Sequence, residues 1–520
     1  MSPRRLPVAA LLLSLSACGP AAEPLTPPPP LPPPPASVPP PAASATAAVD
    51  DFRAKPPPPG QETPFTPPRI EEIKLASGIR LLLVERHELP LVAMRFAFDR
   101  GADQAAPGLG GFMTSMLFQG TKKRNAIAIS DELRAQGIAA DASAEHDAYW
   151  ISARCLADKL PATLDLVADV IEHPAFAKDE LERVRSRRLT SLVQQNDQPG
   201  AILTNTMLSL LYPAGHPYRV QLLGEEAGLT KATAADLAKI HKESFVPDRL
   251  TLAVAGDVQK ADLVAQIERA FAGWKGSSPK PSPPSRPVDD MSQRITLVDR
   301  PGLSQSSIAV ATVGVPRLMA DHDAITLMNT LLGGYFSSRL NSNLRERHAY
   351  TYGARSAFEL RRGPGPFTAG GTFVREHTGD SVREIFTEIK RMREELVTQE
   401  ELDGARIRAI RRLPSKFETA SETAEAVATL SVLDLPLDEY ATVADRLRKV
   451  TREDVQRAAQ AHLAEDKLRV VVVGDAKVVK EQLEALGMGA VTVKVLPKAS
   501  EKKAEDKKAP AKKAPAKAKK

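Results

Sequence analysis

The chain has 520 residues, of which 42% are hydrophobic and 26% are charged, so it can bury the cores of two or more domains and is not disordered overall. Its formal net charge is +6, but residues 498–520 hold ten lysines against three acidic residues. The remainder is near neutral, which argues against nucleic acid as a partner. The lysine-, alanine- and proline-rich end predicts a disordered tail, with contact to anionic lipid or peptidoglycan as the less favoured alternative.

Residues 1–18 have the pattern of a secretion signal. Two arginines precede an apolar run from Leu6 to Leu15, which is too short to span a bilayer. The run ends in Leu-Ser-Ala-Cys and resembles a bacterial lipoprotein signal, so Cys18 is expected to be acylated. Gly19 favours the outer membrane if the cell is Gram-negative. We therefore expect a membrane lipoprotein facing the periplasm, with an ordinary cleaved signal as the alternative. Cys155 is then left without an intrachain disulfide partner.

Residues 19–68 contain twenty prolines, many of them in runs of three or four. Such a composition predicts a polyproline II tether, which rises about 3.1 Å per residue and could span on the order of 100 Å or more. The folded part is therefore expected to stand well away from its membrane anchor. A role as a ligand for proline-binding modules is the less favoured alternative.

The folded part is expected to open with alternating strands at residues 80–85 and 91–98. Residues 108–121 follow, reading Gly-Leu-Gly-Gly-Phe-Met-Thr-Ser-Met-Leu-Phe-Gln-Gly-Thr. They resemble the active-site helix of pitrilysin or insulinase-type zinc peptidases, Gly-Leu-x-His-Phe-x-Glu-His-Met-Leu-Phe-x-Gly-Thr. The two motif histidines fall on Gly111 and Ser115, and the motif glutamate falls on Thr114.

On a helix, positions 111, 114 and 115 would converge on one metal, but glycine and neutral hydroxyls supply neither good zinc ligands nor a base. The resemblance implies a further zinc ligand, a glutamate on a later helix. The matching helix spans residues 179–192, and that glutamate falls on Thr190 or Ser191. The sequence therefore predicts no pitrilysin-type zinc and no cofactor in this chain. An active peptidase with an unrecognised metal site is the least favoured alternative.

The family resemblance continues through the Tyr-Pro, Gly-His-Pro-Tyr and Leu-Gly pairs of residues 212–224. His216, in the middle of this run, has no second histidine or acid at metal-ligand spacing. A structural role is therefore expected for it rather than a functional one.

The chain then repeats itself at an offset of 218 residues. Residues 231–237 resemble residues 449–455, and residues 248–257 resemble residues 466–475 without a gap. An internal duplication explains this match. The predicted organisation is a first half at 69–274, a Pro/Ser-rich linker at 275–292 and a second half at 293–497.

Each half has the same expected order of elements, with opening strands, long amphipathic helices, a strand ending in Gly-Asp and a last helix. This order predicts an α+β fold with helices packed on an antiparallel-rich sheet. The resemblance implies two homologous pitrilysin-like halves, as in the mitochondrial-processing-peptidase branch, that form half of a clamshell. The other expected elements are strands at 294–298 and 306–313 and helices at 160–171, 178–195, 380–396 and 400–413.

The second half retains a further family signature at residues 331–352, a Gly-rich turn followed by Ser-Ser-Arg-Leu and Leu-Arg-Glu. In active relatives an arginine and a tyrosine seven residues apart bind the peptide near the scissile bond. Arg345 and Tyr352 have that spacing, and both side chains can donate to a peptide carbonyl. The alternative is that Arg345 pairs with a surface acid and Tyr352 fills a sheet face.

We therefore expect a non-catalytic, substrate-binding subunit of a heterodimeric periplasmic zinc peptidase. A zinc-bearing pitrilysin-family partner would supply His-x-x-Glu-His and the metal, and peptides or unfolded segments would be the substrates. The alternative is a pseudo-peptidase scaffold or peptide-binding lipoprotein with no role in proteolysis.

Overall fold

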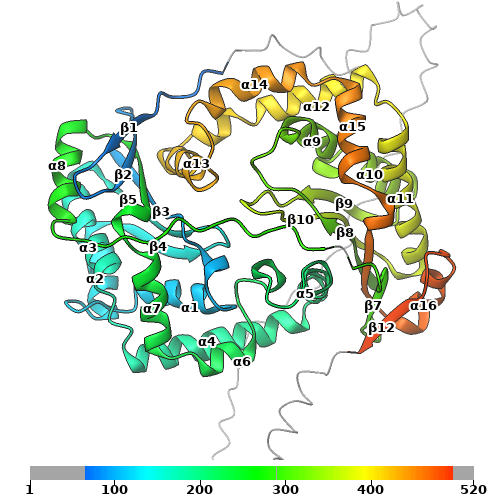
Figure 1. The fold of residues 1–520 in the computed structure, drawn as a ribbon, viewed down its shortest axis with the longest axis horizontal. Helices are drawn as coiled ribbons and strands as arrows, with labels where there is room; N and C mark the ends of the chain where they lie inside the picture. The colour runs from blue at the N-terminus through cyan, green and yellow to red at the C-terminus, as the bar shows by residue number, and fades with distance from the viewer. Residues whose placement is uncertain (1–64, 289, 496–520) are drawn as a thin grey trace, which may run out of the picture. The chain divides into compact units, whose positions relative to one another are not determined.

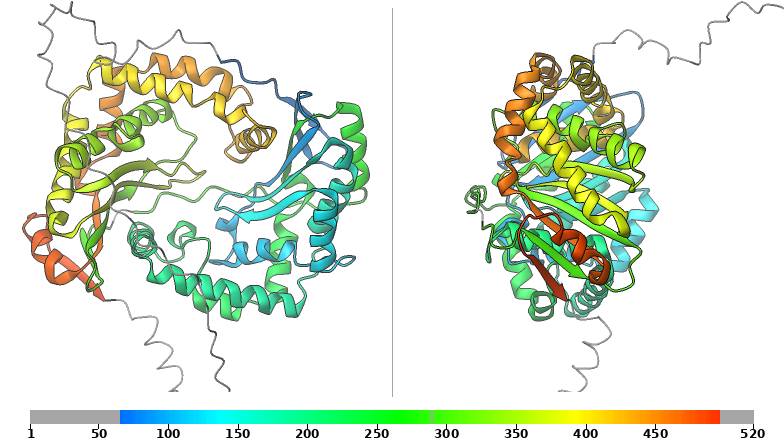
Figure 2. Two further views of the ribbon diagram at one scale, coloured as in Figure 1. Left: turned by 180° about the vertical axis from the view of Figure 1, so that it is seen from behind. Right: turned by 90° about the vertical axis from the view of Figure 1, so that its right-hand side faces the viewer.

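The computed structural model describes residues 65–288 and 290–495. The predicted signal with Cys18, nearly all of the tether and the lysine-rich tail lie outside the described residues. The described chain contains two six-stranded sheets, each packed with helices (Figures 1 and 2). None of the described helices combines the length and the apolar character needed to cross a membrane. The predicted α+β class is confirmed.

The two sheets share the order and directions of five strands and differ in the sixth, since β1 runs antiparallel to β2 whereas β12 runs parallel to β7. In the first, the strand order is β1-β2-β6-β3-β5-β4, and in the second it is β12-β7-β11-β8-β10-β9. In each sheet one opening strand pairs in parallel with the Gly-Asp strand, and the next three pairs are antiparallel. The strands are β1 (Glu71–Lys74), β2 (Arg80–Glu85), β3 (Leu91–Phe98), β4 (Ala139–Ala144), β5 (Tyr149–Leu156), β6 (Leu250–Gly256), β7 (Ile295–Asp299), β8 (Gln305–Val313), β9 (Thr351–Phe358), β10 (Pro366–Val374), β11 (Arg469–Gly474) and β12 (Val491–Val495).

Helices make up most of the rest of each half. The first half contains α1 (Leu109–Leu117), α2 (Ala126–Gln136), α3 (Leu160–Glu172), α4 (Lys178–Asp197), α5 (Pro199–Leu211), α6 (Glu226–Lys231), α7 (Ala234–Ser244) and α8 (Lys260–Ala270). The second half contains α9 (His322–Asn329), α10 (Arg339–Asn341), α11 (Thr378–Glu394), α12 (Gln399–Arg411), α13 (Ala420–Val432), α14 (Glu439–Lys449), α15 (Arg452–His462) and α16 (Ala476–Glu484). Two π-helical turns, Thr330–Gly334 and Ser342–Arg347, flank α10.

The repeated residues play the same structural role at the start of α7 and of α15. Thr233 caps the first helix and forms a capping box with Asp236, and Thr451 does the same with Asp454 at the second. Each box satisfies backbone N–H groups that the first turn of a helix leaves without partners. The duplicated residues therefore start equivalent helices, which then lead into the equivalent strands β6 and β11.

The central strands β6 and β11 are buried along their whole length, because both faces of each sheet are covered. One face packs on helices of the same half. The other face packs on a helix of the opposite half. Helix α13 packs on β2, β3 and β6, and helix α5 packs on β8 and β11, as Figures 1 and 2 show. The two halves thus share their cores.

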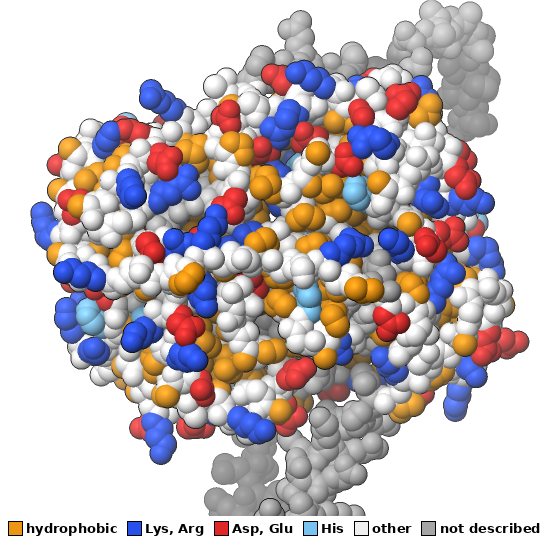
Figure 3. Space-filling view, in the orientation of Figure 1, with side chains coloured by type: hydrophobic (Ala, Val, Ile, Leu, Met, Phe, Trp, Pro, Cys, Tyr) orange, Lys and Arg blue, Asp and Glu red, His pale blue; other side chains and the backbone are white. Residues whose placement is uncertain are grey.

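The surface carries no large field of one charge on the face drawn in Figure 3, where basic and acidic side chains are interspersed. Cys155 lies buried in β5 as a free thiol, and burial raises its pKa.

Candidate functional site

Helix α1 is held in place by a close approach of two backbone segments. Gly108, its N-cap, has φ +81°, and Gly224 has φ +87°. A Cβ on Gly108 would lie 2.6 Å from Gly224 Cα, so neither position has room for a side chain. Both glycines belong to the motifs that carry the family resemblance. Their contact brings residues 222–224 against the first turn of α1.

The guanidinium of Arg188, from α4, lies against this turn. Its Nη1 donates to Gly111 O at 3.0 Å and to Ser115 Oγ at 3.2 Å, and its Nη2 donates to Leu222 O at 3.3 Å and Leu223 O at 3.1 Å. Burial lowers the pKa of Arg188 to about 10, so it remains charged at neutral pH. A fixed cation therefore occupies the space beside the residues that align with the zinc ligands.

The hydroxyl groups of Thr114, Ser115 and Thr190 donate hydrogen bonds to backbone carbonyls of their own helices. Thr114 is buried and its Oγ1 donates to Gly111 O at 3.2 Å, while Ser115 Oγ donates to the same oxygen at 2.7 Å. Thr190 and Ser191 are exposed on α4, and Thr190 Oγ1 donates to Ser186 O.

These residues do not fit zinc, because they offer neither imidazole, thiolate nor carboxylate and because Arg188 places a positive charge beside them. A glutamate that aligns with Thr190 or Ser191 would also start from an exposed face. Within residues 65–288 and 290–495, no group of three or more His, Cys, Asp or Glu side chains is arranged to hold a metal ion.

Arg188 could have been found from periodicity. It continues the apolar stripe of α4 formed by Leu181, Val184 and Leu192, which are all buried. A single basic residue in such a stripe must find partners inside the fold. The sequence analysis instead followed the alignment to positions 190 and 191, two residues away and on the exposed side.

Tyr352 is the second residue of the edge strand β9, and Arg345 lies in the turn that precedes this strand. Arg345, in the π-helical turn Ser342–Arg347, stacks its guanidinium 4.2 Å from the ring centre of Phe336 and lies 3.4 Å from a carboxylate oxygen of Glu346. Phe336 is 65% exposed and Tyr352 is 91% exposed. Neither ring fills a sheet face. Phe336 and Arg345 form a stacked pair, and Tyr352 is exposed on β9, against which the turn of Arg345 packs. Sequence reasoning identified Arg345 and Tyr352 but not Phe336.

The outer edge of β9 is covered in its centre. Asn341 mimics a neighbouring strand, since its Nδ2 donates to Ala354 O at 2.8 Å and its Oδ1 accepts from the Ala354 N–H at 2.9 Å. Gly333, in the Gly-rich turn, approaches the backbone of Ser356 so closely that a Cβ there would collide with it. The Gly-rich turn thus closes part of the sheet edge.

The first sheet ends in β4 (Ala139–Ala144), whose outer edge differs from that of β9. Strand β4 pairs with β5 on one side only. In the described part of the chain, no backbone or side-chain hydrogen bond caps its other side as Asn341 caps β9. Its sequence, Ala-Ala-Asp-Ala-Ser-Ala, carries small side chains that leave the backbone accessible. An exposed edge of this kind can accept an added strand.

His216 makes local structural contacts, with its Nδ1 accepting from the Tyr218 N–H at 3.1 Å and its Nε2 lying 3.2 Å from Ser285 O. With Asp103 and His146 it lines a small cavity of about 150 Å³ beside Gly108. Burial lowers the pKa of His146 to about 3, so this histidine is neutral.

Asp103→Asn is expected to raise the free energy of unfolding at pH 7.5 by about 2 kcal/mol. Burial raises the pKa of Asp103 to about 6, and its side chain is only 9% exposed. The folded state therefore binds this proton more tightly than the unfolded state. The destabilisation by Asp103 is absent below the unfolded pKa of 3.8, grows as the pH rises from there to about 6 and is complete above 6. Urea unfolding of the wild type and of Asp103→Asn at pH 4 and at pH 7.5 measures the difference in the free energy of unfolding.

The exposed Asp141→Asn variant serves as the control for Asp103→Asn and is expected to change stability by less than about 0.5 kcal/mol at either pH. An effect of Asp103→Asn that is the same at both pH values would contradict the assignment of a raised pKa.

The fold and the site together define a class of protein: a two-half α+β chain built like a metallopeptidase but without metal-ligating residues on its motif helix. The chain belongs to the pitrilysin/insulinase family of peptidases, M16. The family model "Insulinase (Peptidase family M16)" matches residues 99–219, and the model "Peptidase M16 inactive domain" matches residues 231–408. The predicted family is confirmed. The match to the inactive-domain model, together with the absence of zinc-ligating residues at positions 111, 114 and 115 of α1, supports a non-catalytic M16-like protein.

Known relatives match this chain over most of their length. An uncharacterized zinc protease of Mycobacterium bovis is 27% identical over 384 residues, covering 72% of this chain and 85% of its own. The non-peptidase homolog YmxG of Helicobacter pylori is 23% identical, covering 78% of this chain and 94% of its own. The solved peptidase M16 inactive domain from Pseudomonas fluorescens has a TM-score of 0.71 at 26% identity, covering 78% of this chain and 98% of that structure.

Proposed function

We propose that this chain is the non-catalytic, substrate-binding subunit of a two-chain zinc peptidase. A related partner would carry His-x-x-Glu-His and the zinc ion, and this chain would contribute a binding surface for peptides or unfolded segments. The observation that carries the proposal is the contrast between its two motifs. The residues of the zinc motif are replaced and Arg188 lies against them, whereas Arg345 is partly exposed and Tyr352 is exposed.

Two features support peptide binding. A guanidinium and a phenol can donate hydrogen bonds to a peptide carbonyl and stabilise developing negative charge. Phe336 adds exposed aromatic surface beside Arg345, and Tyr352 adds an exposed ring on β9. The open edge of β4 would supply the affinity, because an extended peptide can pair its backbone with an edge strand whatever its side chains. Substrates would thus be selected mainly for being extended.

A periplasmic location rests on the sequence of residues 1–18. Acylation of Cys18 would anchor the chain in a membrane, and the proline-rich segment after it would hold the folded part at a distance. Gly19 favours the outer membrane as the site of the anchor. The zinc-bearing partner would then need a secretion signal of its own.

Peptidase activity is expected only when this chain is mixed with a secreted relative that has an intact His-x-x-Glu-His motif. Each chain alone and the mixture are assayed on quenched fluorescent peptides, with zinc and with a chelator. Arg345→Ala in this chain is expected to lower kcat/KM of the mixture by about 100-fold, the loss typical of one hydrogen-bond donor to developing charge.

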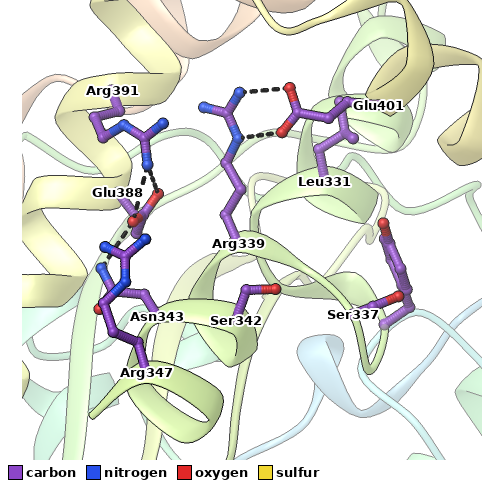
Figure 4. A pocket seen from close by; sticks show the side chains of 10 residues that line it. Leu331, Ser337, Arg339, Ser342, Asn343, Arg347, Glu388, Arg391 and Glu401 are labelled. Atoms are coloured by element: carbon purple, nitrogen blue, oxygen red, sulfur yellow. Dashed lines mark hydrogen bonds and ion pairs between the residues drawn. The ribbon is translucent and has the colours of Figure 1, made fainter.

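Arg347→Ala is the matched control, because Arg347 lies in the same π-helical turn and is exposed, yet lines a different pocket together with Glu388 and Arg391 (Figure 4). It is expected to leave the activity of the mixture unchanged. Zinc-dependent cleavage by this chain alone, or equal effects of the two arginine variants, would refute the proposed division of labour.

A scaffold or peptide-binding lipoprotein without any role in proteolysis is the second candidate. It is favoured by the similarity to the non-peptidase homolog from Helicobacter pylori. No gain in activity on mixing, together with saturable peptide binding by this chain that Arg345→Ala weakens, would select this candidate.

A further inference from the structure

The second half contains a larger cavity that the proposed peptidase function does not use. Its volume is about 470 Å³, within the range of roughly 300–1,000 Å³ that is usual for small-molecule sites. It lies between α9, α12, α13 and α14. Much of its wall is formed by aliphatic side chains, namely Leu360, Leu413, Leu433, Leu435, Val443 and Leu447.

Cations gather around this apolar wall. Arg408 and Arg412 lie one helical turn apart near the end of α12, and Lys416 follows in the next turn. Arg408 stacks 4.1 Å from the ring centre of Tyr335, and Lys416 lies 5.9 Å from that of Tyr440. Among the described residues, neither of these cations nor Arg412 has a carboxylate within ion-pair distance.

The cavity wall holds one carboxylate, and it is already neutralised. Glu439 is 6% exposed, and its Oε1 accepts from Arg317 Nη2 at 2.7 Å and from Arg446 Nη2 at 2.8 Å. It therefore cannot serve Arg408 or Arg412. Like charges four residues apart on a helix repel by roughly 0.2–0.5 kcal/mol when no anion separates them. The cavity thus has an excess of positive charge next to apolar surface.

A purely structural explanation covers only part of this arrangement. Cations near a helix C-terminus are favoured by the helix dipole by about 0.3–1 kcal/mol, which accounts for arginines at the end of α12. It does not account for an apolar space of this size beside them. The cavity opens to solvent, so its aliphatic wall leaves apolar surface in contact with water, and an apolar ligand chain would remove that surface from water.

We propose that this cavity binds a small amphiphile with an apolar body and one anionic group, such as a medium-chain fatty acid. The aliphatic wall accepts the chain, and Arg408 and Arg412 bind the anionic group at the rim. A guanidinium can hold a carboxylate or a phosphate through paired hydrogen bonds. The lining of the cavity does not include Phe336, Arg345 or Tyr352, and the inference does not depend on the function proposed above.

Calorimetric titration of the full-length chain with dodecanoate tests this assignment. We expect saturable binding of one ligand per chain, at least tenfold weaker binding of dodecanol, and no binding of butanoate. Dodecyl phosphate distinguishes a carboxylate site from a general anion site. Binding as tight as that of dodecanoate identifies the shared anionic chemistry, and weaker binding identifies a carboxylate preference.

Two variants probe the two parts of the site. The double variant Arg408→Gln/Arg412→Gln removes the charges from exposed positions and is expected to weaken dodecanoate binding at least tenfold. Ala409→Phe fills the apolar part from the cavity wall and is expected to do the same. Arg187→Gln, an exposed arginine on α4, is the matched control and is expected to bind normally.

The inference is overturned if wild-type protein shows no saturable binding of dodecanoate, or if dodecanol binds as tightly as dodecanoate. It is also overturned if the double variant or Ala409→Phe binds like the wild type. Because the arginines are exposed, their replacement does not endanger folding, and thermal unfolding of each variant checks this point.

Discussion

Replacing Asp147 with alanine is expected to lower the free energy of unfolding by about 3–5 kcal/mol, because it removes one partner of a buried charge pair that joins the two halves. Asp147 lies in the turn between β4 and β5 and is 6% exposed. Its Oδ1 accepts from Tyr218 Oη at 3.0 Å, and its Oδ2 accepts from the Arg362 N–H at 2.8 Å. Without this carboxylate, the buried guanidinium of Arg362 would lose its counter-charge.

The contact is a junction of two hairpins. Arg362 lies in the turn between β9 and β10 of the second half, and its Nη2 donates to the Asp147 carbonyl at 2.7 Å. The neighbouring Gly363 N–H donates to Tyr218 Oη at 3.2 Å. A Cβ on Gly363 would lie 2.7 Å from Pro284 O, so the linker also packs into this junction. Loss of Asp147 therefore disturbs three segments at once.

Urea unfolding followed by tryptophan fluorescence measures this effect, since Trp150 lies three residues further along on β5 and is buried. The exposed Asp141→Ala variant on β4 is the control and is expected to change stability by less than about 0.5 kcal/mol. Tyr218→Phe combined with Asp147→Ala is expected to cost less than the sum of the single variants, because both remove the same hydrogen bond. Equal losses for Asp147→Ala and Asp141→Ala would refute this account.

Gly111→His is expected to destabilise the protein by about 3 kcal/mol, the upper end of the usual cost of overpacking. A Cβ at this position would lie 2.8 Å from Leu222 O and 3.0 Å from Arg188 Nη2. The side chain must therefore displace a backbone segment or the guanidinium. Restoring the complete motif with Gly111→His, Thr114→Glu and Ser115→His is expected not to create a zinc site, because Arg188 repels the metal. A zinc titration against a chelating dye measures this.

Gly111→Ala separates the two physical effects at this position. Helix propensity alone would make alanine more stable than glycine by about 1 kcal/mol, whereas the collision predicts a loss. Gly200→Ala on α5 is the control, since no atom lies within 4 Å of a Cβ there. It is expected to be neutral or stabilising. Stabilisation by Gly111→Ala, or tight zinc binding by the restored motif, would show that the space beside α1 is not closed.

Much of the fold could be predicted from local patterns. Strands β2 and β3 have the expected bounds, and α4 begins at the expected Lys178 and ends two residues beyond the expected 195. These elements have clear periodicity. Strands β1 and β12 were missed because they are short and half-exposed, and only pairing with a neighbouring strand makes them part of a sheet.

The role of the site residues could be predicted to different degrees at the replaced zinc motif and at the motif of Arg345 and Tyr352. The absence of zinc donors at positions 111, 114 and 115 follows from residue type, which is a local property. The presence of Arg188 beside these positions could not be predicted in this way, because it depends on the packing of α4 on α1. Likewise, exposure of Tyr352 could not be separated from a buried role until β9 was seen as an edge strand.

The sequence by itself determined the duplicated α+β plan, the family and the loss of the metal-ligating residues. Each of these depends on the identity of residues close together in the chain or on their repetition. Only the tertiary structure decided that α5 and α13 cover the opposite sheets, that Arg188 occupies the space beside α1 and that Asn341 closes the edge of β9. Periodicity reports which face of an element is buried, but not which distant segment buries it.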